Sequence, residues 1–370
     1  MKDTIRINEL NIKSFRGIVD LNLKDCGDVN IILGDNNCGK TSVLEAVQLF
    51  KNNTISNVID LARTRKIIGG NLNLIDFIYL FNTKNKKIDV SAEINNKNNN
   101  VYLDFNTTEI QFNKDVFLGG ESNPLSKSTI ASLIDNLKID GKPTNQINGT
   151  FVFNDKKEKY SYIPLDFTFG RYKLYNSNTT SNNIVYESPY THFQVSNSMI
   201  SSVKKDPDFY KYFIAALKEF DSEIENVDLL SSNDSEIETT EINIKSKGQY
   251  VPLFAYGDGI KKVMCISSMI YKAKNGILLI DEIETSLHHS YYKDILYFMI
   301  KLCKAYNVQL FITTHNNEII KELTNFNKEN KIKVKMQFYT IKKKQDKTVE
   351  RVLNDEEASN FKSLGGDVRD

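Results

Sequence analysis

The sequence predicts an α/β fold, in which a mostly parallel sheet with flanking helices follows a strand-rich N-terminal lobe and is interrupted by an inserted arm. Three observations support this prediction. The apolar run at 31–33 leads through a loop into a helix-like segment, alternating residues precede it, and the last third alternates strand-like with helix-like segments. We expect residues 1–114 and 236–370 to form two halves of one head, separated by an arm at 115–235.

The N-terminal lobe is predicted from alternation of apolar and polar residues. Ile5 with Ile7, and Leu21 with Leu23, follow the two-residue period of a half-buried strand. Residues 88–112 alternate in the same way on both sides of an Asn-rich stretch, which indicates a hairpin.

The arm is expected to be irregular at first and helical at its end. From about 115 to 205 the chain is polar and rich in Ser and Asn, with one hairpin expected at 150–163. Asp206 followed by Pro207 is a favourable helix start, and apolar residues then recur at helical spacing over about 17 residues. The heptad repeat of a long coiled coil is not sustained here.

Composition excludes several classes of protein. Hydrophobic content of 40% and charged content of 26% are ordinary for a globular chain, and 48 basic residues nearly balance 47 acidic ones. The four cysteines show neither disulfide nor zinc spacing, and no apolar run reaches the roughly 18 residues that cross a bilayer. Because the N-terminus does not resemble a signal peptide, we expect a cytoplasmic protein with no membrane partner.

The loop at 34–41 matches the phosphate-binding pattern G-x-x-x-x-G-K-[ST], between a buried strand and a helix expected at 42–50. In this motif glycines turn backbone N–H groups toward phosphates, Lys40 provides positive charge to the β and γ oxygens, and Thr41 can ligate Mg²⁺. The sequence therefore predicts ATP and Mg²⁺ as cofactors. The residues assigned to the nucleotide are Gly34, Asn36, Asn37, Cys38, Gly39, Lys40, Thr41 and Ser42.

A second apolar strand, at 276–280, ends in two carboxylates, the form of a Walker B motif. We expect Asp281 to hold Mg²⁺ through water and Glu282 to orient or deprotonate the water that attacks the γ-phosphate. The alternative is a strand followed by a solvated acidic turn.

Two further features complete the predicted site. His315 ends the apolar strand at 310–314, and its distance along the chain from Asp281 suits a βαβ unit that brings both strand ends to one rim. We assign His315 to sensing the γ-phosphate. The segment 257–259, Gly257-Asp258-Gly259, precedes an apolar helix expected at 263–271, and exposed N–H groups at such a helix start could bind a phosphate. An ordinary helix cap is the alternative interpretation of this segment.

Two groups of lysines invite a nucleic-acid interpretation. Lys331, Lys333 and Lys335 alternate with apolar residues, and the run 342–344 is entirely lysine. We interpret them instead as charges that keep the edge of a sheet soluble and unpaired.

Taken together, these residues resemble the ABC-type ATPases of the SMC/RecF class, and most closely the overcoming-lysogenisation-defect (OLD) family. The opening segment 12–18, IKSFRGI, is similar to a strand of that class, and segments 213–230 and 312–316 also look like the OLD family. The resemblance implies an ABC-type P-loop ATPase head and a head-to-tail homodimer or higher homo-oligomer. Two ATP molecules would then lie between Lys40, Asp281 and Glu282 of one copy and the segment 257–259 of the other.

The chain departs from the OLD nucleases because it ends about 55 residues after His315. We therefore expect no nuclease domain in it, and a separate effector protein, a nuclease or toxin, as partner in an antiphage or toxin-like system. The alternative function is a RecF-like repair or clamp ATPase with DNA as its partner, which would bind DNA in an ATP-dependent and salt-sensitive manner.

Overall fold

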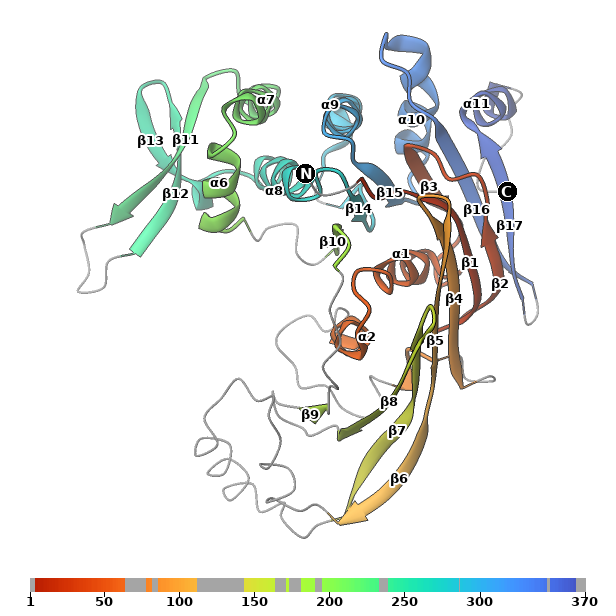
Figure 1. The fold of residues 1–370 in the computed structure, drawn as a ribbon. Coiled ribbons are helices and arrows are strands. Elements are labelled where there is room, and N and C mark those ends of the chain that lie inside the picture. The colour runs from red at the N-terminus through yellow and green to blue at the C-terminus, as the bar shows by residue number, and fades with distance from the viewer. Residues whose placement is uncertain are drawn as a thin grey trace.

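Figure 1 shows the fold of the chain as a computed structural model. The expected irregular part of the arm falls largely outside the described residues. Among the residues that are described, no helix is long and apolar enough to cross a membrane. The structure describes residues 4–63, 78–81, 86–111, 143–163, 171–172, 181–189, 195–232, 239–285, 287–344 and 347–363.

A six-stranded sheet forms the centre of the molecule, with the strand order β10-β14-β15-β3-β16-β17. Its first five strands are parallel and β17 is antiparallel to β16, which confirms the expected α/β class. The strands are β3 (Val29–Leu33), β10 (Ile184–Glu187), β14 (Ile277–Ile280), β15 (Gln309–Thr313), β16 (Met336–Lys344) and β17 (Lys347–Asn354).

Helices cover both faces of this sheet, which explains its continuous apolar strands. Ile31 and Leu33 pack into the core on the side of α6–α10, whereas Ile32 packs into the core that contains α1 and α2 (Figure 1). The helices are α1 (Lys40–Gln48), α2 (Ile55–Arg63), α6 (Asn197–Lys204), α7 (Pro207–Lys218), α8 (Asp258–Lys272), α9 (Tyr292–Ala305), α10 (Asn317–Glu329) and α11 (Asp355–Ser363), with short 3-10 turns at Leu253–Ala255 and His289–Tyr291.

The expected strand-rich lobe is an antiparallel sheet with the order β2-β1-β4-β5-β7-β8-β9, to which β6 adds by pairing with β7. The hairpin of β4 and β5 turns through Asn95 and Asn96 alone, because both adopt positive φ, 50° and 60°, as a two-residue type I′ turn requires. Residues 98–100, expected in the turn, belong to β5. The strands are β1 (Ile7–Phe15), β2 (Ile18–Leu23), β4 (Lys87–Ile94), β5 (Lys97–Asp104), β6 (Asn106–Gln111), β7 (Pro143–Phe153), β8 (Lys156–Ile163) and β9 (Arg171–Tyr172).

The described parts of the expected arm, 115–235, contribute to three different sheets. β7 and β8, which include the hairpin expected at 150–163, extend the N-terminal sheet, and β10 pairs with β14 in the central sheet. The remainder, α6, α7 and β11 (Ile224–Ser232), packs near α8. β11 pairs with β12 (Thr239–Ser246), which follows position 235 and pairs in turn with β13 (Gln249–Pro252). The boundaries at 114 and 235 stay a prediction.

The helix expected after Asp206 is α7. Its cap forms as anticipated, since the Asp206 carboxylate accepts a hydrogen bond from the N–H of Phe209 at 3.1 Å. The helix spans 12 residues and is shorter than expected, because the chain turns after Lys218 and enters β11 at Ile224.

Candidate nucleotide site

The glycine loop lies between β3 and α1, at the carboxyl edge of the central sheet. Gly34 has φ 136° and Gly39 has φ 112°, values that L side chains rarely adopt. A Cβ at Gly34 would also lie 2.3 Å from the carbonyl oxygen of Ile341 on β16. α1 starts after Gly39 without a side-chain cap, so the N–H groups of its first turn are available to an anion.

Lys40 folds back over this loop. Its ammonium donates to the carbonyl oxygens of Gly34 and Asp35, both at 2.8 Å, and the side chain is 8% exposed. These carbonyl groups hold the amine at the mouth of the loop, where a phosphate oxygen can replace or join them as acceptor.

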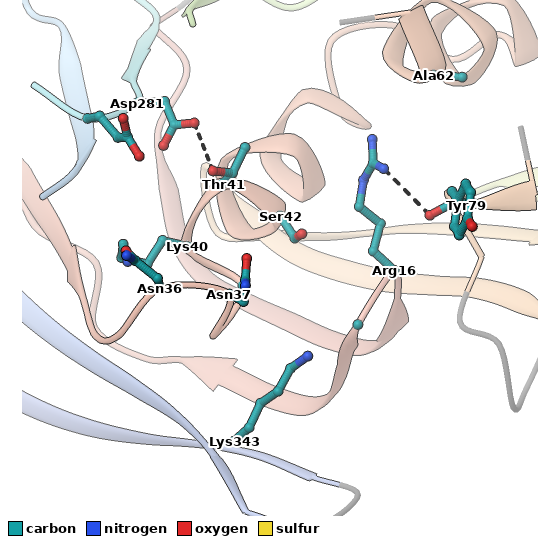
Figure 2. Close-up of a pocket in the computed structure, with 13 residues that line it drawn as sticks. Arg16, Asn36, Asn37, Lys40, Thr41, Ser42, Ala62, Tyr79, Asp281 and Lys343 are labelled. Atoms are coloured by element: carbon teal, nitrogen blue, oxygen red, sulfur yellow. Dashed lines mark hydrogen bonds between the residues drawn. The ribbon is translucent and has the colours of Figure 1, made fainter. Parts of the chain in front are cut away.

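Asp281 brings the two ends of the predicted site together. One carboxylate oxygen, Oδ2, accepts a hydrogen bond from the Thr41 hydroxyl at 2.8 Å (Figure 2). The other, Oδ1, accepts a hydrogen bond from the Thr313 hydroxyl at 2.6 Å. Asp281 is 2% exposed, so the fold fixes it rather than leaving it in a solvated turn. The acidic strand end therefore meets the glycine loop across 240 residues of sequence.

Glu282 occupies a constrained turn immediately after Asp281. Its φ is 49°, in the left-handed region, and its N–H donates to the Thr313 hydroxyl at 2.8 Å. A non-glycine residue in this region costs about 1 kcal/mol or more, and such strain is concentrated at functional sites. The Thr313 hydroxyl thus donates to Asp281 and accepts from the N–H of Glu282, so it anchors both acidic residues.

A cavity of about 830 Å³ opens between the loop and the end of β14 (Figure 2). Eight of the residues assigned from sequence line it: Asn36, Asn37, Gly39, Lys40, Thr41, Ser42, Asp281 and Glu282. Five others also line it that were not assigned to the site from sequence: Arg16, Gly17, Ala62, Tyr79 and Lys343.

Gly34 and Cys38 shape the loop without lining this cavity. The Cys38 sulfur lies 2.8 Å from the position that a Cβ on Gly34 would occupy, so the thiol fills the space beneath the loop. Burial raises the pKa of the Cys38 thiol, which keeps it protonated and disfavours a reactive thiolate.

His315 and the segment 257–259 do not line the cavity either. His315 follows β15, and its ring nitrogen Nδ1 lies 2.9 Å from the carboxylate of Glu284, two residues beyond Glu282. Gly257 is the N-cap of α8, and Asp258 and Gly259 begin that helix, again without a side-chain cap. The strand ends of β14 and β15 do share one edge, as the βαβ spacing predicts.

Arg16 and Lys343 supply two further cations at the cavity, and they come from distant parts of the chain. Arg16, at the turn between β1 and β2, holds buried Glu45 of α1 in a two-point ion pair, with Nε 2.7 Å from Oε2 and Nη2 3.0 Å from Oε1. Lys343 is exposed and extends from β16 toward the loop, with its amine beside Gly17 (Figure 2).

The sequence gives different amounts of information about the place of these two cations at the site. The IKSFRGI segment was a signal for Arg16, because it contains this arginine and Gly17. Lys343 had only the signal of its lysine run, which we interpreted as an edge strand. The first part of β16, Met336–Thr340, lies between β3 and β17, whereas Lys342, Lys343 and Lys344 pair with β17 alone among the described strands.

The oxygen atoms at this site fit the ligand preference of Mg²⁺. Thr41 presents a hydroxyl and Asp281 a carboxylate, 2.8 Å apart, and Mg²⁺ favours a few such oxygens with water and substrate phosphates completing an octahedron. Elsewhere in the described ranges no cluster of three or more His, Cys, Asp or Glu side chains could hold a metal ion.

The strand β3, the glycine loop and the helix α1 follow one another here, and the hydroxyl of Thr41 donates to Asp281, a buried carboxylate at the end of another strand. This arrangement defines a P-loop ATPase of the AAA/ABC type. The family model described as "AAA domain, putative AbiEii toxin, Type IV TA system" matches residues 29–321. The chain belongs to this family.

Several known proteins are similar to the chain. A Helicobacter pylori protein named "ATP/GTP phosphatase" is 25% identical over 341 residues, which cover 86% of this chain and 87% of that protein. Among solved structures, the SMC head domain from Thermotoga maritima is 11% identical with a TM-score of 0.41, covering 94% of this chain and 99% of its own. The recombination mediator RecF is 11% identical with a TM-score of 0.40, covering 94% and 98%.

Proposed function

We propose that this chain binds ATP with Mg²⁺, hydrolyses it to ADP and phosphate, and uses the cycle to close and open a dimer. The contact of the Thr41 hydroxyl with Asp281 Oδ2 at 2.8 Å carries this proposal. It supports a site with a phosphate-binding loop on one side and a carboxylate for the metal on the other.

Each residue then has a role in an in-line displacement. Lys40 and the N–H groups at the start of α1 bind the β- and γ-phosphates. Thr41 and Asp281 would hold Mg²⁺, which would neutralise charge on the phosphate oxygens. Glu282 accepts a proton from the attacking water as the water oxygen bonds to the γ-phosphorus. The bond from that phosphorus to the bridging oxygen breaks, and ADP and phosphate leave.

The segment 257–259 is proposed to act on the nucleotide of a second copy. It lies outside the cavity that Lys40 and Asp281 line, and its helix start carries no side-chain cap. Gly257 has open space around it, with no described atom within 4 Å of an added Cβ. A helix start without a side-chain cap and with open space around it can bind a phosphate group of a nucleotide held by a partner subunit. A head-to-tail homodimer would place such a nucleotide there.

The wider role that we propose is control of a separate effector, a nuclease or toxin, in an antiphage or toxin-like system. The family description names a putative AbiEii toxin and a type IV TA system, and the Helicobacter pylori relative is named a phosphatase of ATP and GTP. The name of the relative favours nucleotide hydrolysis, the family description favours a toxin-like system, and the OLD-like segments of the sequence favour the OLD branch.

Phosphate release from ATP by the purified chain tests the proposed function. We expect Mg²⁺-dependent turnover in the wild type, and loss of ATP binding in Lys40→Ala. Glu282→Gln should still bind ATP but release phosphate at least 100-fold more slowly, because the proton acceptor is gone while its shape remains. Wild-type protein that neither binds nor hydrolyses ATP, or a Glu282→Gln variant with unchanged turnover, would contradict the proposal.

A further inference from the structure

The turn after β14 carries a carboxylate that reaches across to the end of β15. Glu284 Oε1 accepts a hydrogen bond from the backbone N–H of His315 at 3.0 Å and lies 2.9 Å from Nδ1 of the same residue. The Glu284 side chain is only 9% exposed, whereas that of His315 is 53% exposed. Glu284 is therefore the anchored member of the pair, and the imidazole is the member that a ligand can reach.

Glu284 belongs to the same tight turn as Glu282. The Thr285 N–H donates to the Glu282 carbonyl at 2.9 Å, and the Ile283 N–H donates to the Thr313 carbonyl at 3.2 Å. These bonds tie the turn to itself and to the end of β15. The backbone of the turn therefore holds Glu284 in a fixed place beside the end of β15.

The carboxylate determines which nitrogen of His315 faces outward. When Nδ1 donates its proton to Glu284, Nε2 is the ring nitrogen that faces away from this carboxylate. The contacts of Glu284 with the backbone N–H and with Nδ1 of His315 fix the orientation of the ring.

Lys262 supports the same turn from α8. Its ammonium is fully buried and donates to the carbonyl oxygens of Ile283, at 2.7 Å, and of Thr285, the two neighbours of Glu284. Lys262 lies about one turn beyond the segment 257–259 on the same helix. The start of α8 is thereby connected through Lys262 and Glu284 to His315.

We infer that Glu284 is a positioning residue, which orients His315 toward the γ-phosphate and connects it to α8. This inference rests on the proposed ATPase function. Since Glu284 acts through His315, its removal should matter only while the histidine is present. Glu284 itself does not line the cavity.

A double-mutant cycle in the ATPase assay tests this inference. Glu284→Ala and His315→Ala should each lower kcat by about 10- to 100-fold, the range found when an orienting partner of a functional histidine is removed, with KM for ATP little changed. The double variant should be no slower than His315→Ala, and Glu284→Gln, which keeps an acceptor, should recover part of the loss. Glu318→Ala, which removes an exposed carboxylate three residues from His315, is the control and should behave as wild type.

Imidazole ¹⁵N NMR gives a second readout that requires no catalysis, and the chain has only four histidines to assign. His315 should show a protonated, hydrogen-bonded Nδ1 in the wild type and lose this signature in Glu284→Ala. Additive losses in the cycle, or an Nδ1 signal that Glu284→Ala leaves unchanged in a folded variant, would overturn the inference. If the signature is present but the wild type lacks ATPase activity, the proposed function fails while the Glu284–His315 contact holds.

Discussion

Replacement of Lys262 by methionine should change how the stability of the protein depends on pH. Burial lowers the pKa of Lys262 from 10.5 to about 7, against the opposing influence of the Glu284 and Glu187 carboxylates. At about 1.4 kcal/mol per pKa unit, this fall corresponds to about 5 kcal/mol of cost for the charged form in the folded protein. Methionine fills a similar volume and carries no charge.

The sign of the effect follows from proton binding. Below pH 7 the folded and unfolded chains both hold the Lys262 proton, so the full cost is present and does not vary with pH. Between pH 7 and 10.5 the unfolded chain holds the proton and the folded chain has released it. The free energy of unfolding contributed by Lys262 therefore rises with pH, by up to about 1.4 kcal/mol per pH unit.

Urea unfolding followed by circular dichroism, at pH 6, 7, 8 and 9, measures this effect. The free energy of unfolding of the wild type minus that of Lys262→Met should change little from pH 6 to 7 and rise by about 2 kcal/mol from pH 7 to 9. Lys261→Met is the matched control, and its difference from wild type should be independent of pH over this range. A Lys262→Met difference that is flat or falls above pH 7 would refute the account of a buried, partly neutral lysine.

Three further predictions concern the cavity, the core and the thiols. Lys343→Ala should weaken ATP binding about fivefold to tenfold, because the lost charge contributes about 1 kcal/mol of binding free energy at a solvated site. Lys344→Ala is the control and should leave ATP binding unchanged. Equal Kd values for the two variants by calorimetry would refute this prediction. Gln309→Leu should lower the free energy of unfolding by about 2 to 4 kcal/mol. The buried Gln309 amide makes hydrogen bonds to the backbone N–H and carbonyl of Ile7 and to the carbonyl of Gly27, each at 2.8 or 2.9 Å, and leucine would remove these hydrogen bonds. A loss under about 1 kcal/mol in a urea titration would contradict this expectation. All four cysteines are buried, so Ellman's reagent should react with none in the folded chain and with four in urea; rapid reaction of one thiol in the folded chain would contradict this.

The parts of the site that sequence predicts are those in which neighbouring residues act together. The strand, loop and helix around Lys40 are contiguous, and glycine, lysine and threonine at fixed spacing leave few alternatives. The pair Asp281 and Glu282 directly follows an apolar run, so its position at the end of a strand could also be predicted from neighbouring residues alone. The parallel order of β14, β15 and β3 then explains why these separate segments meet.

The residues that sequence missed reach the site only through the topology of the sheet. Lys343 lies near the loop because β16 pairs with β3, and no local pattern reveals that pairing. The role of Glu284 depends on a turn whose left-handed residue, Glu282, is not glycine, so the sequence lacks the usual sign of such a conformation.

Alternation of residue types also misled in one place. Lys331, Lys333 and Lys335 alternate with apolar residues as in a strand, but strand β16 begins only at Met336. The chain before it is held by other contacts, in which the N–H of Lys335 donates to Asp28 at 3.0 Å and its amine pairs with Asp25. Tertiary hydrogen bonds outweigh a short periodic pattern here.

A mixing experiment tests most directly the central claim that two copies of the chain complete each ATP site. Lys40→Ala removes the phosphate contact of a copy's own cavity, and Gly257→Glu adds a charge at the start of α8, where the fold leaves open space. Each variant alone should be inactive. Equal amounts mixed should regain about a quarter of wild-type phosphate release, because half of randomly formed dimers hold one intact site out of two. An inactive mixture of two folded variants, or full activity in Gly257→Glu alone, would contradict the claim.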